Sequence, residues 1–205
     1  MIVKICGLQT LEAAKHAVQN GADFLGIILV PNRQRTISNE TACEISKYLN
    51  SLPTPRPKLV GVFRNQSLEE IQYLQKLIGL DVIQLHGNET VGLVKSIDVP
   101  VVRRLVPESP TLLEDAKVLQ DLQQQVTLLI DSEQGGDGKL VNWNQLNQLA
   151  NNGYHYILAG GLTPENVHSA STQPGCIGVD VSGGVETNGT KDLGKIELFL
   201  KNAKI

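Results

Sequence analysis

Apolar residues gather along the chain in short runs, and most runs are followed by a more polar segment that carries helix start or stop signals. The run from Phe24 to Val30 is nearly unbroken, as expected of a strand that is covered on both faces. The runs that predict strands are residues 2–6, 24–30, 59–63, 82–86, 99–106, 126–131, 156–159 and 177–181. The segments that predict helices are residues 10–20, 38–49, 67–78, a short one from about 89, 111–123, 143–151, one after 164 and one after 192.

Capping residues mark several of the predicted helices. Ser67 stands three residues before Glu70, which is the spacing of a capping box, and Ser38 can cap the helix that follows it, to about Leu49. Thr10 supplies a start for the first helix and Gly21 a stop, because glycine readily adopts the left-handed conformation that ends a helix. These signals support a regular alternation of strand and helix.

The alternation predicts an α/β protein of the (β/α)8 TIM-barrel class, formed as a single domain over residues 1–205. Strands that alternate with helices pair in parallel through right-handed crossovers. A doubly wound open sheet of the flavodoxin type is the competing fold. It needs fewer units, and its phosphate loop commonly follows the first strand, where this chain has Cys6-Gly7-Leu8-Gln9. We therefore favour the barrel, at the small end of its usual size range.

Composition narrows the function classes. The 205 residues are 41% hydrophobic and 19% charged, with a formal net charge of −3, which gives no support to nucleic-acid binding or to a basic membrane-surface face. No apolar run is long enough to cross a bilayer, and no targeting segment is evident, so we expect no membrane partner. The three cysteines are an odd number without metal or redox spacing. We therefore expect a cytoplasmic protein without a metal and, since no exposed apolar stripe stands out, a monomer.

Two apolar runs near the end of the chain stop at small, flexible residues. The first run leads into Gly160 and Gly161, with Thr163 and Pro164 suited to start a helix, and the second leads into Ser182, Gly183 and Gly184. Each pair alone is as well explained by a tight turn. Two such units separated by one helix favour a phosphate grip after the last two strands of a barrel, which predicts a phosphorylated small-molecule substrate.

Function in such barrels gathers at the carboxyl ends of the strands, so these ends select the candidate site residues. The residues selected are Cys6, Arg33, Arg35, Arg64, His86, Arg103, Arg104, Asp131 and Asp180.

Cys6 is the cysteine at such an end; Cys43 lies within a predicted helix and Cys176 begins the eighth strand. A lone cysteine is ordinarily a small buried hydrophobe. Next to a phosphate site and a basic loop, however, the thiolate would be favoured and could act as a base. Lys4 shares a strand face with Cys6, and in the barrel interior it would need Asp180 or Gln84 as a partner.

Asp131 ends an otherwise apolar strand, where a carboxylate is unexpected unless it is used; a capping or loop role is the plainer explanation. Partial burial would favour its protonated form and let it act as an acid. Arg33 and Arg35 suit a carboxylate in the substrate, although exposed arginines are usually only solvated. We expect His86 to line the site, and Asp180 to serve as an interior charge partner or to touch the substrate.

Seven segments, spread from end to end, resemble the phosphoribosylanthranilate isomerase family, in particular its fungal single-function members. They are residues 3–8, 31–37, 60–66, 84–87, 135–139, 159–167 and 179–186. The stretch from Thr111 to Gln125, rich in leucine and glutamine, is less typical of the family.

The resemblance implies an isomerase of tryptophan biosynthesis that needs no cofactor. The implied reaction is the Amadori rearrangement of N-(5-phosphoribosyl)anthranilate to 1-(2-carboxyphenylamino)-1-deoxyribulose 5-phosphate. By analogy, Asp131 is the general acid, Cys6 the general base and Arg35 the holder of the anthranilate carboxylate. The backbones at Gly160-Gly161 and Ser182-Gly183-Gly184 would bind the phosphate.

Two alternatives remain open on the sequence. A related phosphate-binding barrel, such as indole-glycerol-phosphate synthase, would need a catalytic lysine at the mouth and an N-terminal extension. A catalytically silent barrel that only binds a phosphorylated ligand is the other alternative, and the presence of both Cys6 and Asp131 argues against it.

Overall fold

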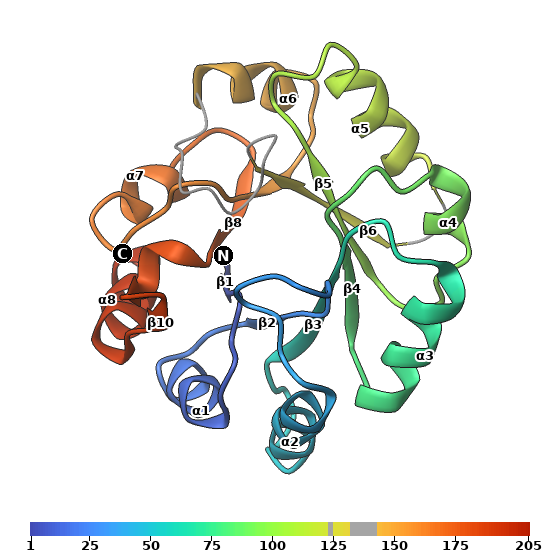
Figure 1. Cartoon of the computed structure of the whole chain (residues 1–205). Helices are drawn as coiled ribbons and strands as arrows, with labels where there is room; N and C mark the ends of the chain where they lie inside the picture. Colours follow the sequence, from blue (N-terminus) through green and yellow to red (C-terminus); the bar gives the residue numbers. More distant parts are fainter. Residues whose placement is uncertain (123–124, 132–142) are drawn as a thin grey trace.

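A computed structural model shows a closed barrel of parallel strands surrounded by helices (Figure 1). It describes residues 1–122, 125–131 and 143–205. The barrel strands are β1 (Ile2–Ile5), β2 (Phe24–Ile28), β3 (Lys58–Phe63), β4 (Val82–Leu85), β5 (Val101–Leu105), β6 (Val126–Ile130), β7 (Tyr156–Leu158) and β8 (Cys176–Val181). They follow one another in chain order, and β8 closes the barrel by pairing in parallel with β1. The predicted fold class is confirmed.

The helices form the outer ring of the barrel, between consecutive strands (Figure 1). They are α1 (Leu11–Gln19), α2 (Asn39–Asn50), α3 (Leu68–Ile78), α4 (Val91–Lys95), α5 (Leu112–Gln120), α6 (Asn147–Asn151), α7 (Val167–Ser171) and α8 (Leu193–Ala203). A 3-10 turn, η1 (Trp143–Leu146), precedes α6, and a second, η2 (Gly183–Val185), follows β8. A short antiparallel hairpin of β9 (Glu186–Thr187) and β10 (Thr190–Lys191) leads into α8, and the sequence pattern did not predict it.

Several capping predictions are confirmed in atomic detail. Thr10, Ser38 and Ser67 each accept a hydrogen bond from the backbone N–H three residues on, at 3.2 Å. These bonds satisfy helix N–H groups that have no partner within the helix. Gly21 has a φ of +85° just beyond α1, in the conformation expected of a helix stop.

Two helix starts differ from the prediction. The helix after β7 begins at Val167 and not at Pro164. The Asn166 side chain accepts from the Thr163 N–H at 2.8 Å and donates to the Gly161 carbonyl at 3.0 Å, which holds the preceding segment in a turn. The helix predicted from about Glu89 begins at Val91 and is capped by Thr90. The predicted end of the α5 helix at Gln123 lies outside the described residues.

Two apolar layers hold the barrel together. The larger cluster fills the space between strands and helices, and a smaller one fills the barrel centre with Val60, Val82, Val102, Leu129 and Ile157. Because side chains alternate along a strand, positions two or four residues further on point in the same direction. This places Arg64, His86, Arg104 and Asp131 above the central layer, at the carboxyl ends of β3 to β6.

Candidate active site

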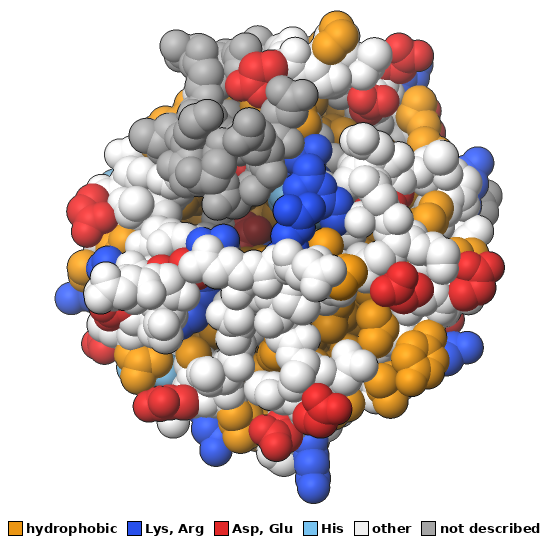
Figure 2. Space-filling view, viewed as in Figure 1, with side chains coloured by type: hydrophobic (Ala, Val, Ile, Leu, Met, Phe, Trp, Pro, Cys, Tyr) orange, Lys and Arg blue, Asp and Glu red, His pale blue; other side chains and the backbone are white. Residues whose placement is uncertain are grey.

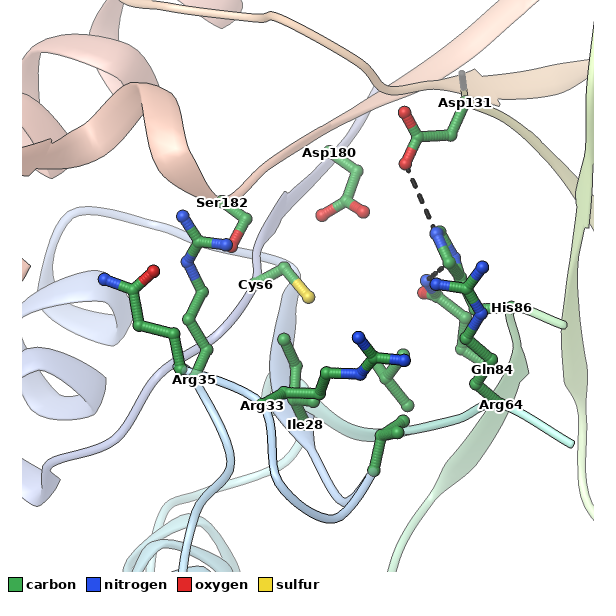
Figure 3. A pocket seen from close by; sticks show the side chains of 13 residues that line it. Cys6, Ile28, Arg33, Arg35, Arg64, Gln84, His86, Asp131, Asp180 and Ser182 are labelled. Carbon is green, nitrogen blue, oxygen red and sulfur yellow. Dashed lines mark hydrogen bonds and ion pairs between the residues drawn. The ribbon is translucent and has the colours of Figure 1, made fainter. Parts of the chain in front are cut away.

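A pocket of about 300 Å³ opens at the carboxyl ends of the strands. Cys6, His86, Asp131, Asp180, Arg33 and Arg35 are among the residues that line it, together with Arg64 and Ser182. Figure 3 shows the Cys6 thiol and the Asp131 carboxyl turned toward this hollow from different sides. In the space-filling view, Lys and Arg side chains gather beside the opening (Figure 2). Most of the residues that were selected because they stand at the carboxyl ends of strands therefore line one site.

Lys4 and Asp180 form an ion pair at the base of this pocket. The Lys4 ammonium is fully buried and lies 3.0 Å from Oδ1 and 3.1 Å from Oδ2 of Asp180. The two residues sit directly opposite each other in the β1–β8 pairing. Asp180 is one of the two partners that we expected for a lysine in the barrel interior, and its carboxylate also borders the pocket.

Cys6 lies beside this ion pair and is 6% exposed. Burial raises the pKa of the Cys6 thiol above its ordinary value, and the nearby Asp180 carboxylate acts in the same direction. The Lys4 ammonium opposes both effects, with a smaller contribution from Lys191. The neighbouring cations do favour the thiolate, but removal from water outweighs them, so the net direction is opposite to the favoured thiolate that we expected.

The groups around Lys4 hold it in its charged form. Although burial disfavours its ammonium, the charges of Asp180 and Cys6 raise the pKa of Lys4 above its ordinary value. The ammonium therefore stays charged and is available to stabilise a thiolate whenever one forms.

Asp131 is buried at the carboxyl end of β6 and faces His86. His86 Nε2 lies 3.4 Å from Asp131 Oδ2, and Gln84 Nε2 lies 3.3 Å from His86 Nδ1 (Figure 3). With the Gln84 amide donating, Nδ1 is the acceptor and the ring proton lies on Nε2, toward the carboxyl group. The three side chains form a row along one wall of the pocket, and His86 lines the site as predicted.

Arg35 reaches across the seam of the barrel to Glu186 in the hairpin after β8. Its Nε lies 2.6 Å from Oε1 and its Nη2 2.9 Å from Oε2, which is a two-point pairing. Lys191 Nζ lies 2.6 Å from the same Oε1 and donates to the Ser182 carbonyl at 2.9 Å. Although burial acts to raise the pKa of Glu186, the bonds from Arg35 and Lys191 hold it below its ordinary value. The two bonds occupy two of the five guanidinium N–H donors of Arg35.

Sequence reasoning did not select Glu186 or Lys191. Glu186 pairs with Arg35, 151 positions away, and with Lys191 across the hairpin, and no motif of the sequence pattern marked either contact. Glu186 is the last residue of segment 179–186, which resembles the family, and this resemblance is the signal that could have selected Glu186 as a site residue.

Arg103 and Arg104 point in opposite directions from β5. Arg103 donates to the carbonyls of Leu85 and Gly87, at 3.2 and 2.9 Å, and pairs with the buried Glu89 carboxylate at 3.0 Å, so it supports loops and does not face the pocket. Arg104 is buried on the inward face. Glu89, expected at a helix start, is thus the buried acid of an ion pair.

The glycine loops after β7 and β8 enclose a second hollow of about 240 Å³. Gly160 and Gly161 have φ values of +84° and +64°, which non-glycine residues rarely adopt. A side chain at Gly184 would collide with the Leu162 carbonyl, so the two loops pack directly against each other. Asp131, Asp180 and Ser182 border both hollows, so the two are adjoining parts of one site. Residues 135–139, one of the segments that resemble the family, lie outside the described residues.

The described part of the chain contains neither a metal-binding cluster nor a membrane-spanning helix. In this part of the chain, no three His, Cys, Asp or Glu side chains are arranged to hold a metal ion. Within the same ranges, no helix combines the length and apolar character needed to cross a membrane.

Comparisons with known proteins point to one family. A family model described as N-(5'phosphoribosyl)anthranilate (PRA) isomerase matches residues 3–202. The chain is 48% identical to an N-(5'-phosphoribosyl)anthranilate isomerase of Saccharomyces cerevisiae, over 99% of this chain and 94% of that protein.

Solved structures agree with the sequence comparison. A phosphoribosyl anthranilate isomerase of Thermotoga maritima matches with a TM-score of 0.87 and 34% identity, over 100% of this chain and 99% of that one. A phosphoribosyl anthranilate isomerase solved in complex with reduced 1-(o-carboxyphenylamino)-1-deoxyribulose 5-phosphate matches with a TM-score of 0.82 and 34% identity, over the same shares of the two chains.

Proposed function

The chain belongs to the phosphoribosylanthranilate isomerase family, the isomerases of tryptophan biosynthesis, and we propose that Cys6 and Asp131 carry out its reaction as general base and general acid. The resemblance seen in the motifs is thereby confirmed, and the substrate is a phosphorylated small molecule. The observation that carries the proposed mechanism is that both side chains line one pocket at the carboxyl ends of β1 and β6.

Ring opening is the step we assign to Asp131. Its protonated carboxyl group gives a proton to the ring oxygen of the phosphoribosyl group. The bond between that oxygen and C1 breaks as the anthranilate nitrogen shares its electron pair with C1, which leaves a Schiff base. Two observations support this role. Asp131 lies beside His86, and it borders both hollows, so its carboxyl group stands where the two hollows meet.

Proton removal is the step we assign to Cys6. Its thiolate takes the proton from C2, and the electrons of that bond move toward the Schiff-base nitrogen to give an enolamine. The enolamine loses its hydroxyl proton and gains one at C1, which yields the ketone product. Asp131 is left as a carboxylate and Cys6 as a thiol, and one proton transferred between them through water in the open mouth restores both groups. The ammonium of Lys4 supports this step, because it stabilises the thiolate that the step needs.

The two ends of the substrate need separate anion sites. We assign the phosphate to the backbone N–H groups at Gly160, Gly161, Ser182, Gly183 and Gly184, whose adjoining hollow supports the assignment. We assign the anthranilate carboxylate to Arg35, which lines the main pocket and has donors that its pairing with Glu186 does not use. Asp180 keeps Lys4 charged, and His86 lines the path of the sugar.

A turnover assay tests the function as a whole. Purified protein should make the fluorescence of N-(5-phosphoribosyl)anthranilate fall in the presence of a metal chelator and without any nucleotide. The product, isolated from the same reaction, should be the ribulose phosphate. Unchanged fluorescence at a protein concentration that saturates the substrate would exclude the isomerase.

The ionisation of Cys6 gives a prediction that depends on pH. Since burial raises the pKa of this thiol, the thiolate should be scarce at neutral pH and should appear only above the ordinary thiol range of about 8.5. The difference in far-ultraviolet thiolate absorbance between the protein and Cys6→Ser, followed against pH, isolates this group. A midpoint below pH 7.5 or so would contradict the burial argument.

We also propose that the enzyme works as a cytoplasmic monomer. Cys6, Cys43 and Cys176 are all free thiols, which fits a reducing compartment. Apart from Tyr73 and Leu77, which stand four positions apart on α3, the exposed large apolar side chains of the described residues are dispersed over separate elements, for example Val118 on α5 and Leu198 on α8. Such scattered residues do not form the contiguous patch that an obligate interface needs. Sedimentation at micromolar concentration tests the monomer directly.

A further inference from the structure

Two arginine side chains at the pocket have no role in the acid–base steps. Arg33 and Arg64 both line the main pocket. Figure 3 shows their guanidinium groups turned toward the same part of the hollow, on the side away from Ser182. Their positive charges belong to two different loops, after β2 and after β3.

Neither guanidinium group has an ion-pair or hydrogen-bond partner in the described part of the chain. Other arginines of the same ranges are paired: Arg35 with Glu186, Arg56 with Asp81 and Arg103 with Glu89. A positive side chain that faces a pocket and is not itself paired with a carboxylate is available to a negative group of a ligand.

Of the two, Arg64 is the better prepared to bind. It is half-buried, whereas Arg33 is exposed. The Arg64 N–H donates to the Gln66 side chain at 3.0 Å, and the Asn65 N–H donates to the buried Glu89 carboxylate at 2.8 Å. Gln66 also donates to the carbonyl of Leu29, the residue that follows β2, at 3.1 Å, which ties this loop to the end of that strand. The backbone that carries Arg64 is therefore fixed before any ligand arrives, which lowers the entropic cost of binding.

Arg104, on the inward face of β5, adds to the positive charge near Arg64. Burial lowers the pKa of Arg104, the Asp131 carboxylate opposes this, and the charges of Arg64 and Arg103 lower it further. Like charges brought together at the edge of a pocket repel one another, and a bound anion relieves that repulsion.

The topology of the barrel says which anion this is. In the closed order from β1 to β8, β3 lies four strands from β7, so Arg64 stands across the mouth from the Gly160-Gly161 loop. The substrate carries its phosphate on C5 of the sugar and its carboxylated ring on C1. A substrate whose phosphate lies at the glycine loops therefore extends its carboxylate toward the loops after β2 and β3.

We propose that Arg64 is a specificity-determining residue that binds the anthranilate carboxylate from the β3 side, opposite the phosphate site. This inference rests on the proposed function and adds a second cation to the contact assigned to Arg35. Arg35 is partly neutralised by Glu186, whereas Arg64 brings a full charge to the pocket.

Paired ligands test the assignment. One is a reduced, non-reacting analogue of the product, and the other is the same molecule with a phenyl ring in place of the carboxyphenyl ring. Arg64→Gln should weaken binding of the carboxylated ligand by roughly 10- to 100-fold, as expected for the loss of a hydrogen bond to a charged group. Binding of the phenyl ligand should change by less than about 3-fold, since its phosphate and sugar contacts remain. Calorimetric titration measures both constants.

The matched control is Lys76→Gln, which removes the same charge from the exposed face of α3 and should leave both affinities unchanged. If Arg64→Gln weakened the binding of both ligands by the same factor, the proposal would be overturned, since Arg64 would then act through its charge on the whole ligand and not on the carboxylate. Unchanged affinities would overturn it too, as would a selective loss seen in Arg33→Gln but not in Arg64→Gln. Failure of the proposed function would appear separately, as native protein that binds neither ligand and turns over no substrate.

Discussion

Replacing Asp131 with asparagine should lower kcat by roughly 10³-fold, which is within the usual range for loss of a general acid. The amide nearly matches the carboxyl group in size and has N–H groups, but it does not release a proton to the ring oxygen. Opening of the ring would then depend on water. Stopped-flow or steady-state loss of substrate fluorescence measures the change.

Binding should separate this effect from a loss of structure. The dissociation constant of the reduced product analogue should stay within a few-fold of the native value, because the anion sites at both ends of the pocket are untouched. Asp121→Asn, an exposed change at the end of α5, is the matched control and should leave kcat as it is. A variant at position 131 that retains a tenth of native turnover would transfer the acid role to another group.

Replacing Cys6 with serine should lower kcat by about 10²-fold or more. The hydroxyl is almost isosteric with the thiol but ionises far less readily, so the ammonium of Lys4 would face a group that stays neutral. Ring opening by Asp131 would still occur, and removal of the C2 proton would become limiting. Deuterium at C2 of the substrate should therefore slow the variant more than the native enzyme.

The other cysteines provide the comparison for this variant. Cys43→Ser on α2 removes a thiol that is distant from the pocket lining and should leave turnover unchanged. If Cys6→Ser turned over at the native rate, the thiol would have no part in the reaction, and a different base would have to be sought among the residues that line the pocket.

Much of the fold could be predicted because its information is local. Apolar runs, capping residues and glycine stops each lie within a few positions of the element they define, and the barrel follows from their regular alternation. The same locality explains the pairing of Lys4 with Asp180: alternation along β1 and β8 puts both side chains on the inner face. The helix after β7 was placed too early because the Asn166 side chain holds the preceding turn, a contact that capping preferences do not reveal.

The residues that line the site could be predicted from the sequence, but most of the ion pairs among its side chains could not. Strand ends selected Cys6, Asp131 and His86 correctly as pocket residues, since the barrel brings these ends together. The pairing of Arg35 with Glu186 joins positions 151 residues apart, and the direction of Arg103 toward Glu89 depends on how two loops fold over β5. The ionisation of Cys6 could not be predicted either, because it depends on the balance between burial and charge.

The bond between Lys4 and Asp180 has a consequence for how activity arises during synthesis. It joins the first barrel strand to the last one, across 176 positions. Until β8 has docked, the lysine has no counter-ion and the thiol next to it stays open to water. A ribosome-bound chain that has emerged only as far as β7 should therefore be inert even with Cys6 and Asp131 already made, and the reactive centre is completed by the final act of barrel closure.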